Sequence, residues 1–396
     1  MIPARYLLPS LGRLAADTFV LVSGPRQVGK TTVAREWLMA KPNGRYLNWD
    51  IAADRAAMLH RDFPGRSLPG ALVLDEIHKY PRWKSWLKGL YDARASRVPT
   101  VVTGSARLDI YQRGGDSLLG RVAHLRLHPL TIGELTRDPN ATIEAPVDWL
   151  NLGDATAPFD LWTRLERRSG FPEPFLRDDA QQHRRWSNSR RALLIREDLR
   201  DLTQIRQLAL VEHLALLLPE RVGSPLSINA LREDLQVGHD TASAWIEALE
   251  RLYYAFRIAP FTKRVARALT KEQKLYLWDW SQVESEGARF ENMVASHLLK
   301  AVHYWTDLGL GDFDLRYVRD REKREVDFVI TESRRPVLLV ECKLRDESPH
   351  APLLHFQSML GGIPAVQLVR TPSVDRRIPG ESVRIVSAVT WLAGLP

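Results

Sequence analysis

Cysteine is almost absent from this chain of 396 residues, which contains Cys342 alone. A single thiol cannot form an internal disulfide, so the sequence excludes the disulfide-stabilised extracellular class and fits a reducing cytoplasm. Long hydrophobic runs are also absent: the most apolar helical stretch, residues 208–218, is interrupted by Glu212 and His213. That stretch is too short to span a bilayer, and the N-terminus lacks the apolar core of a signal peptide. We therefore expect a cytoplasmic protein without a membrane partner.

The chain has no internal repeat and no low-complexity tract, which excludes repeat architectures. Its length suffices for two or three domains, and its composition of 44% hydrophobic and 26% charged residues is that of a soluble globular protein. The formal net charge of +8 makes an anionic partner such as DNA a candidate. A merely arginine-rich composition would give the same charge, so this alternative stays open.

A phosphate-binding loop follows the first predicted strand. Apolar residues 20–22 lead into a glycine, four further residues, a second glycine, a lysine and a threonine, and then into a helical pattern. The predicted nucleotide-binding residues are Gly24, Pro25, Arg26, Gln27, Val28, Gly29, Lys30, Thr31 and Thr32. Glycines let backbone N–H groups surround a polyphosphate, and the helix adds its positive end. We expect Lys30 to contact the β- and γ-phosphates of ATP and Thr31 to bind Mg²⁺.

Acidic and polar residues follow later strands of the same predicted sheet. Short apolar segments at residues 45–49, 71–74, 99–103 and 122–127 alternate with helical patterns, which predicts a parallel sheet covered on both faces. Ligands bind at the carboxyl ends of such strands. Asp75 directly follows the segment 71–74 and is expected to support Mg²⁺, and the adjacent Glu76 to orient or deprotonate the attacking water.

Further catalytic candidates lie at the end of the segment 99–103 and after it. Thr103 and Ser105 could form a polar sensor of the γ-phosphate, although small polar residues after a strand are often only turn formers. Arg121 lies where an arginine could offset the charge of the transferring phosphoryl group, with Arg107 as the competing candidate. The alternative for each arginine is ordinary surface charge.

These segments together resemble a group of prokaryotic AAA+-type ATPases. The resemblance is carried by residues 24–31, 74–79, 103–105, 120–121 and 127–130, together with Glu134. In that group the ATPase is followed by a C-terminal domain of unknown function. The resemblance covers most of the chain and implies an AAA+-like parallel sheet in residues 1–136, with ATP and Mg²⁺ as cofactors.

The middle of the chain is expected to contain a linker and helical connector, residues 137–222, and a winged helix-turn-helix, residues 223–287. Ser227 can cap a first helix, residues 241–252 form a second, and a hairpin follows. One interpretation places Thr241, Ser243 and Trp245 at a DNA groove. It adds a basic wing of Lys263, Arg264, Arg267 and Lys271 on phosphates. The other makes this region a lid on the nucleotide domain.

Residues 288–396 contain a pattern of carboxylates and a lysine. Asp327 lies on one predicted strand, and Glu341 and Lys343 lie on the next. This spacing resembles the PD-(D/E)XK core of restriction-endonuclease-like α/β domains, although Val326 replaces the proline. Asp327 and Glu341 on adjacent antiparallel strands would bind Mg²⁺, and Lys343 would activate water. Glu291 on the preceding helix could complete the metal site, and Gln357 on the following helix could orient it. The alternative is a charged hairpin.

The sequence as a whole predicts Mg²⁺-dependent ATP binding and hydrolysis that controls a DNA-directed C-terminal module, with metal-dependent nuclease activity as one option. The alternative is a nucleotide-switched binding or regulatory protein whose nuclease-like domain does not cut. A third alternative is a DNA-free role, with the basic charge facing protein or RNA. The oligomeric state stays open, with a homo-oligomer among the options.

Overall fold

The computed structural model divides the chain into two compact units, Ile2–His128 and Pro129–Pro396. The structure describes residues 5–60, 70–94, 98–104, 118, 120–138, 141, 143–153, 156–200, 205, 207–262, 272–345 and 348–396. Six residues discussed above lie outside these ranges, namely Ser105, Arg107, Lys263, Arg264, Arg267 and Lys271. The predicted sensor at Ser105 and the predicted basic wing therefore stay predictions.

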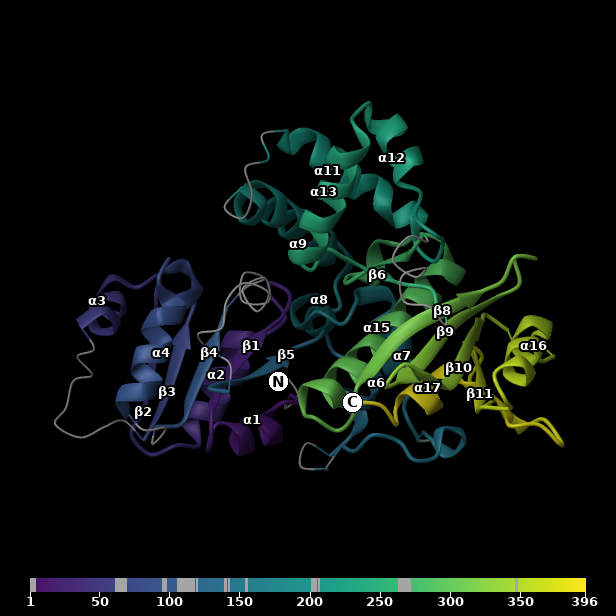
Figure 1. Ribbon diagram of the computed structural model, residues 1–396, viewed down its shortest axis with the longest axis horizontal. Helices are drawn as coiled ribbons and strands as arrows, with labels where there is room; N and C mark the ends of the chain where they lie inside the picture. The colour runs from purple at the N-terminus through teal and green to yellow at the C-terminus, as the bar shows by residue number, and fades with distance from the viewer. Residues whose placement is uncertain are drawn as a thin grey trace. The chain divides into compact units, whose positions relative to one another are not determined.

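The N-terminal unit is built on a five-stranded sheet in which every neighbouring pair is parallel (Figure 1). The strand order is β2-β3-β4-β1-β5, with β1 at Phe19–Ser23, β2 at Gly44–Asn48, β3 at Ala71–Asp75, β4 at Thr100–Thr103 and β5 at Val122–Arg126. Its helices are α1 Leu8–Leu14, α2 Lys30–Met39, α3 Ala52–His60, the short η1 Ile77–Lys79 and α4 Trp83–Arg94. The apolar segments of the sequence thus form the predicted parallel sheet.

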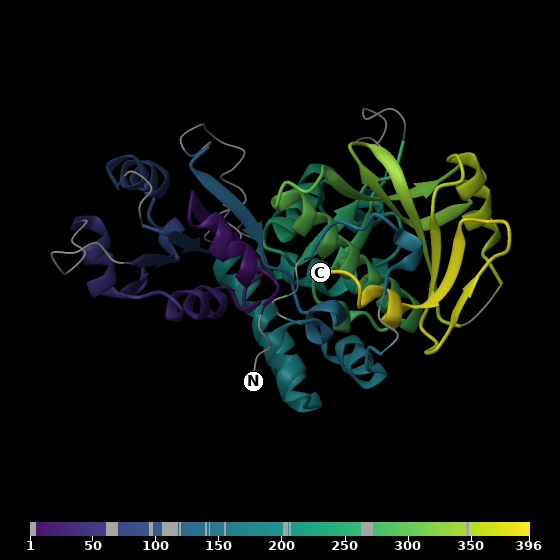
Figure 2. The same cartoon turned by 90° about the horizontal axis from the view of Figure 1, so that it is seen from below.

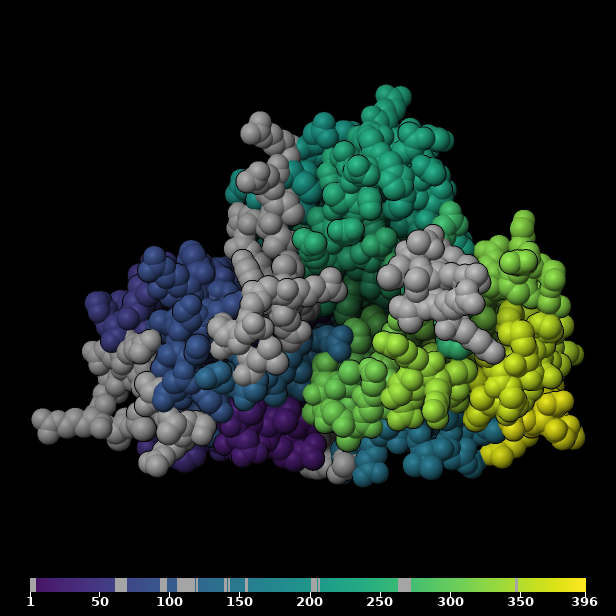
Figure 3. All heavy atoms as spheres, viewed as in Figure 1, coloured from purple at the N-terminus to yellow at the C-terminus, as the bar shows by residue number. Residues whose placement is uncertain are grey.

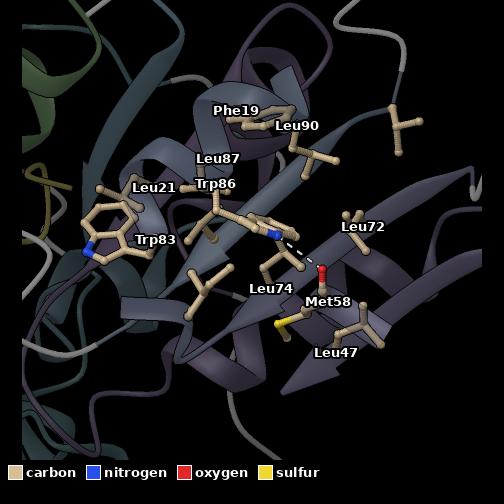
Figure 4. Close-up of a cluster of buried hydrophobic side chains, with 13 residues drawn as sticks. Phe19, Leu21, Leu47, Met58, Leu72, Leu74, Trp83, Trp86, Leu87 and Leu90 are labelled. Carbon is tan, nitrogen blue, oxygen red and sulfur yellow. Dashed lines mark hydrogen bonds between the residues drawn. The ribbon is translucent and has the colours of Figure 1, made fainter. Parts of the chain in front are cut away.

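Side chains of α4 pack against one face of this sheet (Figure 4). The buried cluster consists of Phe19, Leu21, Leu47, Met58, Leu72, Leu74, Ile77, Trp83, Trp86, Leu87, Leu90, Val98 and Val102. The indole N–H of Trp86 donates a hydrogen bond of 3.2 Å to the carbonyl oxygen of Met58, which satisfies its buried polar atom. Because side chains alternate along a strand, Val20 and Val22 point to the opposite face, where they are also fully buried. Both faces of the sheet are therefore covered, as predicted.

The C-terminal unit begins with helices. They are α6 Ile132–Thr136, η4 Trp149–Asn151, α7 Phe159–Arg168, α8 Pro172–Arg177, α9 Ala180–Leu193, η5 Leu194–Leu199, α11 Leu208–Leu217 and η6 Leu218–Arg221. A helix-turn-helix follows, α12 Ile228–Leu235 and α13 His239–Arg251, and then the antiparallel pair β6 Ala255–Ile258 and β7 Lys274–Leu277. The Ser227 hydroxyl accepts from the Ala230 N–H and caps α12, as predicted. In the space-filling view α11 to α13 form a teal-to-green lobe of this unit (Figure 3).

A six-stranded mixed sheet forms the rest of the C-terminal unit, in the order β12-β13-β11-β10-β9-β8. The strands are β8 Phe313–Arg319, β9 Glu325–Glu332, β10 Arg335–Lys343, β11 Ala365–Val369, β12 Asp375–Arg377 and β13 Val383–Ser387. Strands β11 to β13 are the yellow edge of this sheet in Figure 2. The accompanying helices are η7 Trp280–Gln282, α15 Glu286–Asp307, α16 Ala351–Met359 and α17 Ala388–Leu392.

The segment after His128 belongs physically to the C-terminal unit. The hydroxyl of Thr131 donates to the carbonyl oxygen of Pro396 at 2.9 Å. Buried Lys300 on α15 pairs with buried Glu134 at 2.6 Å. Because of these contacts, the boundary between the two compact units lies between residues 128 and 129, whereas the sequence predicted the end of the first domain at residue 136.

Candidate functional site

The backbone between β1 and α2 has the curvature that a phosphate-binding loop needs. Gly24 has a φ of 143°, and a Cβ there would lie 2.3 Å from the carbonyl oxygen of Leu127, so only glycine fits. Gln27 and Gly29 also have positive φ values, of 64° and 101°. Gly29 is the N-cap of α2 and has no side chain to cap the first N–H groups of the helix. These N–H groups lie where the sequence predicted anion-binding donors, at the start of α2.

Arg5 stabilises this loop through hydrogen bonds to its backbone, a role that no pattern in the sequence indicated. Its buried guanidinium donates one hydrogen bond of 2.6 Å to the carbonyl oxygen of Val28 and another of 2.6 Å to that of His128. The neighbouring Tyr6 hydroxyl donates to the carbonyl of Arg126 at 2.7 Å. An arginine before the first strand carries no local motif, because its partners lie far away in the sequence. The loop is thereby tied to the end of β5.

Asp75 accepts hydrogen bonds from three hydroxyl groups at the end of β3. Thr31 donates at 2.9 Å and Tyr46 at 2.6 Å, both to Oδ2, and Thr103 donates to Oδ1. The side chain is buried, with the residue 2% exposed. The predicted pair Thr31 and Asp75 is therefore brought together, and Tyr46 is a third donor that the sequence did not indicate.

Glu76 follows Asp75 with a left-handed backbone, φ 57°, unusual for a glutamate. Its amide donates to the carbonyl of Thr103 at 3.0 Å, which fixes it beside β4. Burial raises the pKa of Glu76 above the ordinary carboxyl value, while Lys79 at 3.5 Å opposes this shift. A carboxyl group with a raised pKa at the edge of the sheet is suited to accept a proton.

Lys30 and Arg121 lie at different ends of the sheet. The Lys30 ammonium folds over the loop and donates to the carbonyl oxygens of Gly24 at 2.9 Å and Pro25 at 2.7 Å. Arg121 immediately precedes β5, which runs parallel to β1, so it lies at the amino end of the strands. Its Nε donates to Asp92 at 2.9 Å. Arg121 therefore does not lie beside the phosphate-binding loop of its own chain, and its role at a transferring phosphoryl group stays a prediction.

The residues of the N-terminal unit fit Mg²⁺ and a nucleotide. Hydroxyl and carboxylate oxygens are the ligands that Mg²⁺ prefers, and those of Thr31 and Asp75 are 2.9 Å apart. Lys30 supplies a cation for phosphate, and the loop supplies N–H donors. When bound, Mg²⁺ would neutralise phosphate charge at this edge of the sheet.

In the C-terminal unit β9 and β10 are adjacent and antiparallel, as predicted. Their register pairs Val340 with Phe328 and so places Glu341 opposite Asp327. The amide of Asp327 donates to Glu341 at 3.3 Å, and the amide of Cys342 donates to Asp327 at 2.9 Å. The two predicted carboxylates therefore lie side by side, each bonded to the backbone of the other strand.

A lysine that the sequence analysis missed lies among the carboxylates. The ammonium of Lys274, from β7, lies 2.6 Å from Glu325, 3.2 Å from Glu291 and 3.3 Å from Asp327. The Tyr276 hydroxyl donates to Glu291 at 2.7 Å. Burial and the nearby Asp327 raise the pKa of Glu291 to about 8. Lys274 is the first residue of the predicted hairpin strand, and a lysine at the start of a strand carries no metal-site signal.

Glu341 has basic partners on its other side. Lys343 lies 3.0 Å from Glu341, and the Nδ1 of His350 lies 2.7 Å from the same oxygen. Gln367 on β11 is the parallel neighbour of Glu341 and accepts from the His350 amide at 2.8 Å. Gln357, the predicted orienting residue, is buried on α16. The glutamine that holds His350 is Gln367.

This constellation does not fit a Mg²⁺ ion. Mg²⁺ needs several oxygen ligands at 2.0–2.1 Å in octahedral geometry. Here an ammonium lies within 3.3 Å of Glu291, Glu325 and Asp327, and Glu341 is paired with Lys343 and His350. Within the described ranges, no group of three or more His, Cys, Asp and Glu side chains is arranged to hold a metal ion. The predicted metal ligands Asp327 and Glu291 are brought together, but around Lys274, whereas Glu341 lies opposite Asp327 and pairs with Lys343 and His350.

One predicted DNA-contacting residue of α13 is buried. Trp245 is 3% exposed and packs inward, so the prediction that it faces a DNA groove is wrong. Thr241 and Ser243 are half-buried, and the exposed residues of α13 carry both signs of charge, with Asp240 and Glu247 as well as Arg251. The period of the helix turns Trp245 to the inside together with Ile246 and Leu249.

Three parts of the chain match known families. Residues 16–136 match the family described as "AAA domain", residues 160–284 "Domain of unknown function (DUF8612)" and residues 286–388 "Domain of unknown function (DUF4143)". With the parallel sheet and the loop described above, the first match makes residues 16–136 a P-loop AAA domain. The other two matches give no function.

Two mycobacterial proteins are similar to most of the chain. The chain is 22% identical over 386 residues to "Uncharacterized protein Rv2008c" of Mycobacterium tuberculosis (strain ATCC 25618 / H37Rv), covering 90% of this chain and 82% of that protein. The same values hold for "Uncharacterized protein Mb2031c" of Mycobacterium bovis (strain ATCC BAA-935 / AF2122/97).

Two solved structures show a weak overall likeness. The Aeropyrum pernix ORC1 protein in complex with DNA is 19% identical, with a TM-score of 0.33 and coverage of 75% of this chain and 96% of that chain. The Thermotoga maritima RuvB Holliday junction branch migration motor is 19% identical, with a TM-score of 0.30 and coverage of 64% and 86%. Scores this low carry no argument about function. In the part of the chain that the structure describes, no helix is both long and apolar enough to cross a membrane.

Proposed function

We propose that the AAA domain binds ATP with Mg²⁺ and hydrolyses it. The observation that carries the proposal is the buried Asp75 carboxylate beside the phosphate-binding loop. It accepts hydrogen bonds from the hydroxyl groups of Thr31 on α2 and Thr103 on β4. Lys30 would move from the loop carbonyls to the phosphates, and Thr31 with Asp75 would hold Mg²⁺. Glu76, with its raised pKa, would accept the proton of the attacking water.

The test separates binding from hydrolysis. Lys30→Ala should abolish binding of a fluorescent ATP analogue, whereas Glu76→Gln should retain binding and lose hydrolysis by about 100-fold or more. Lys79→Met, measured at a pH where Glu76 is ionised, serves as a matched control, since Lys79 lies 3.5 Å from Glu76 and would act only on the pKa of that carboxyl group. ATP binding that survives Lys30→Ala would refute the assignment of the loop.

Arg121 can act on phosphate only from one chain to the site of another, because it lies at the amino end of its own sheet. We therefore include a homo-oligomer in the proposal, with Arg121 as the finger presented to a neighbouring copy. In an isolated chain Arg121 would then contribute nothing to hydrolysis. Its exposed ion pair with Asp92 is weak enough to exchange for a phosphate contact.

The C-terminal unit is proposed to be a restriction-endonuclease-like domain that does not cut, under the control of the nucleotide state. The observation in favour of this alternative over a nuclease is the ammonium of Lys274 among Glu291, Glu325 and Asp327. Nuclease assays with Mg²⁺ or Mn²⁺ on DNA and RNA should therefore be negative. Cleavage that disappears in Lys343→Ala would establish the competing nuclease function.

If the module is DNA-directed, α9 is the element whose charge suits a polyanion. Its sequence contains no acidic residue, and Arg184 and Arg185 are exposed. Burial of Trp245 disfavours a role of α13 as the helix that reads a DNA groove. Phosphate contacts made by arginines are sequence-independent and depend on salt.

Anisotropy titrations with labelled DNA test this surface. Arg184→Glu/Arg185→Glu should weaken binding by about tenfold and reduce the slope of log affinity against log salt by about 2. Arg321→Glu, an exposed site on the β8–β9 turn, is the matched control. Unchanged DNA affinity in the double variant would reject α9, and tighter binding of RNA than DNA would favour an RNA partner.

A further inference from the structure

We infer that Lys274 is a built-in cation that replaces the metal ion of the C-terminal carboxylate cluster, and that its removal exposes a divalent-cation site. The inference rests on the proposed nuclease-like fold of this unit. It is independent of ATP hydrolysis by the N-terminal unit.

The geometry around Lys274 is that of a filled site. A lysine ammonium has three N–H donors, and here three carboxylates from α15 and β9 lie within 3.3 Å of it. The Lys274 side chain is 1% exposed, so water cannot take the place of these partners. The ring of Tyr317, with its centroid 5.7 Å from the ammonium, adds a face that attracts a cation.

The charge balance explains why a cation is needed at this position. Glu291, Glu325 and Asp327 would repel one another if all were ionised without a counter-charge. The Tyr276 hydroxyl donates to Glu291, which relieves part of this repulsion. A divalent ion would satisfy the same oxygens, so the ammonium and a metal compete for one position.

The backbone keeps the ammonium there. Lys274 begins β7, and Ile258 of β6 is its antiparallel partner. An isolated bridge joins Lys274 to Pro225 on its other side. Pairing on both sides fixes the position from which the Lys274 side chain starts, and its burial and its three carboxylate partners hold the ammonium at the cluster.

The experiment measures Mn²⁺ binding to the full chain without nucleotide, by electron paramagnetic resonance, and thermal unfolding in EDTA and in Mn²⁺. We expect wild-type protein to show no Mn²⁺ binding that depends on Asp327, and no change of its melting temperature between EDTA and Mn²⁺. Lys274→Ala should be destabilised in EDTA and should bind Mn²⁺ about 10-fold or more tightly than wild type, with recovery of stability. Adding Asp327→Asn to this variant should remove the gain.

Two results would overturn the inference. One is stoichiometric Mn²⁺ binding by the wild type that Asp327→Asn abolishes. The other is a folded Lys274→Ala protein that gains no Mn²⁺ binding. If Lys274→Ala fails to fold in either solution, Lys274→Met takes its place in both measurements, with the same results expected and the same results overturning the inference. Lys274→Met tests the charge alone, and its melting temperature should fall because three carboxylates lose their counter-ion. Failure of ATP hydrolysis would leave all these readouts unchanged, since no nucleotide is present.

Discussion

The guanidinium of Arg5 donates a hydrogen bond of 2.6 Å to the carbonyl oxygen of Val28, inside the phosphate-binding loop. Its second bond, to the carbonyl oxygen of His128, reaches the last residue of the same compact unit. Since a peptide group is planar, the direction of the Val28 carbonyl also fixes the direction of the N–H of Gly29. Arg5 thus controls the orientation of a proposed phosphate donor without approaching the phosphate itself.

The first prediction concerns this contact. Arg5→Met leaves two buried carbonyl groups without a donor, and hydrogen bonds from charged groups contribute about 1.5–3 kcal/mol each. We expect the N-terminal unit to lose about 3 kcal/mol of unfolding free energy and the ATP affinity to fall, measured by thermal unfolding and by titration of a fluorescent ATP analogue at low temperature. Arg5→Lys, which retains the charge and can reach one carbonyl, should show the smaller loss. Unchanged ATP affinity in folded Arg5→Met would show that the contact is only structural.

The second prediction concerns the pH dependence of ATP hydrolysis. Burial raises the pKa of Glu76, and only the ionised carboxylate accepts a proton from water, so kcat should fall as the pH drops through this raised pKa. Lys79 lies 3.5 Å from Glu76 and stabilises the ionised form. Lys79→Met should therefore move the acid limb of the pH–kcat profile to higher pH. A limb at the same pH in both proteins would assign it to another group.

The third prediction concerns Arg121, at the amino end of β5. If it serves a neighbouring copy, Arg121→Ala should bind ATP normally and hydrolyse it at least about 10-fold more slowly. Mixing Arg121→Ala with Glu76→Gln chains should restore part of the activity, because each mixed interface can combine an intact Glu76 with an intact Arg121. Hydrolysis measured over a range of protein concentrations gives the control. No recovery on mixing would exclude action between chains.

Local pattern was enough to predict the parallel sheet, the loop and the pairing of β9 with β10. Glycine spacing, apolar strands and a carboxylate after a strand are short-range signals, so Thr31 and Asp75 could be identified before their hydrogen bond was known. The strand register then follows from the alternation of buried side chains.

The missed residues act over long distances in the chain. Arg5 bonds to His128, and Lys274 contacts Asp327, so neither lies within a motif that a sequence window can contain. The position of Arg121 depends on topology: the sequence places it beside a strand, but only the parallel register of β5 with β1 shows which end of the sheet it occupies. Trp245 was misplaced because the phase of a short amphipathic helix depends on which neighbours cover it.

The last prediction concerns His297, which is fully buried on α15. Its Nδ1–H donates to the carbonyl of Met293 at 2.7 Å, and its Nε2 accepts from the amide of Ile132 at 3.1 Å, so the neutral ring satisfies both contacts. Burial lowers the pKa of His297 to about 3. In the unfolded chain His297 takes up a proton as the pH falls through about 6.5, whereas in the folded chain it stays neutral down to about pH 3. The free energy of unfolding is therefore highest above about pH 6.5 and falls as the pH drops toward 3. Between pH 7.5 and pH 5.0 this group should cost about 2 kcal/mol of unfolding free energy.

Urea unfolding at these two pH values measures the effect. Trp162 and Trp280 have ring centroids 6.2 Å and 6.1 Å from that of His297, so tryptophan fluorescence reports on this part of the fold. His297→Gln retains a donor and an acceptor but has no titrating group, so its loss of stability on acidification should be smaller than that of wild type by about 2 kcal/mol. All other titrating groups are common to both proteins and cancel in the difference. An equal loss in both proteins would mean that His297 accepts a proton in the folded state, and the neutral ring between Met293 and Ile132 would then be the wrong description of this contact.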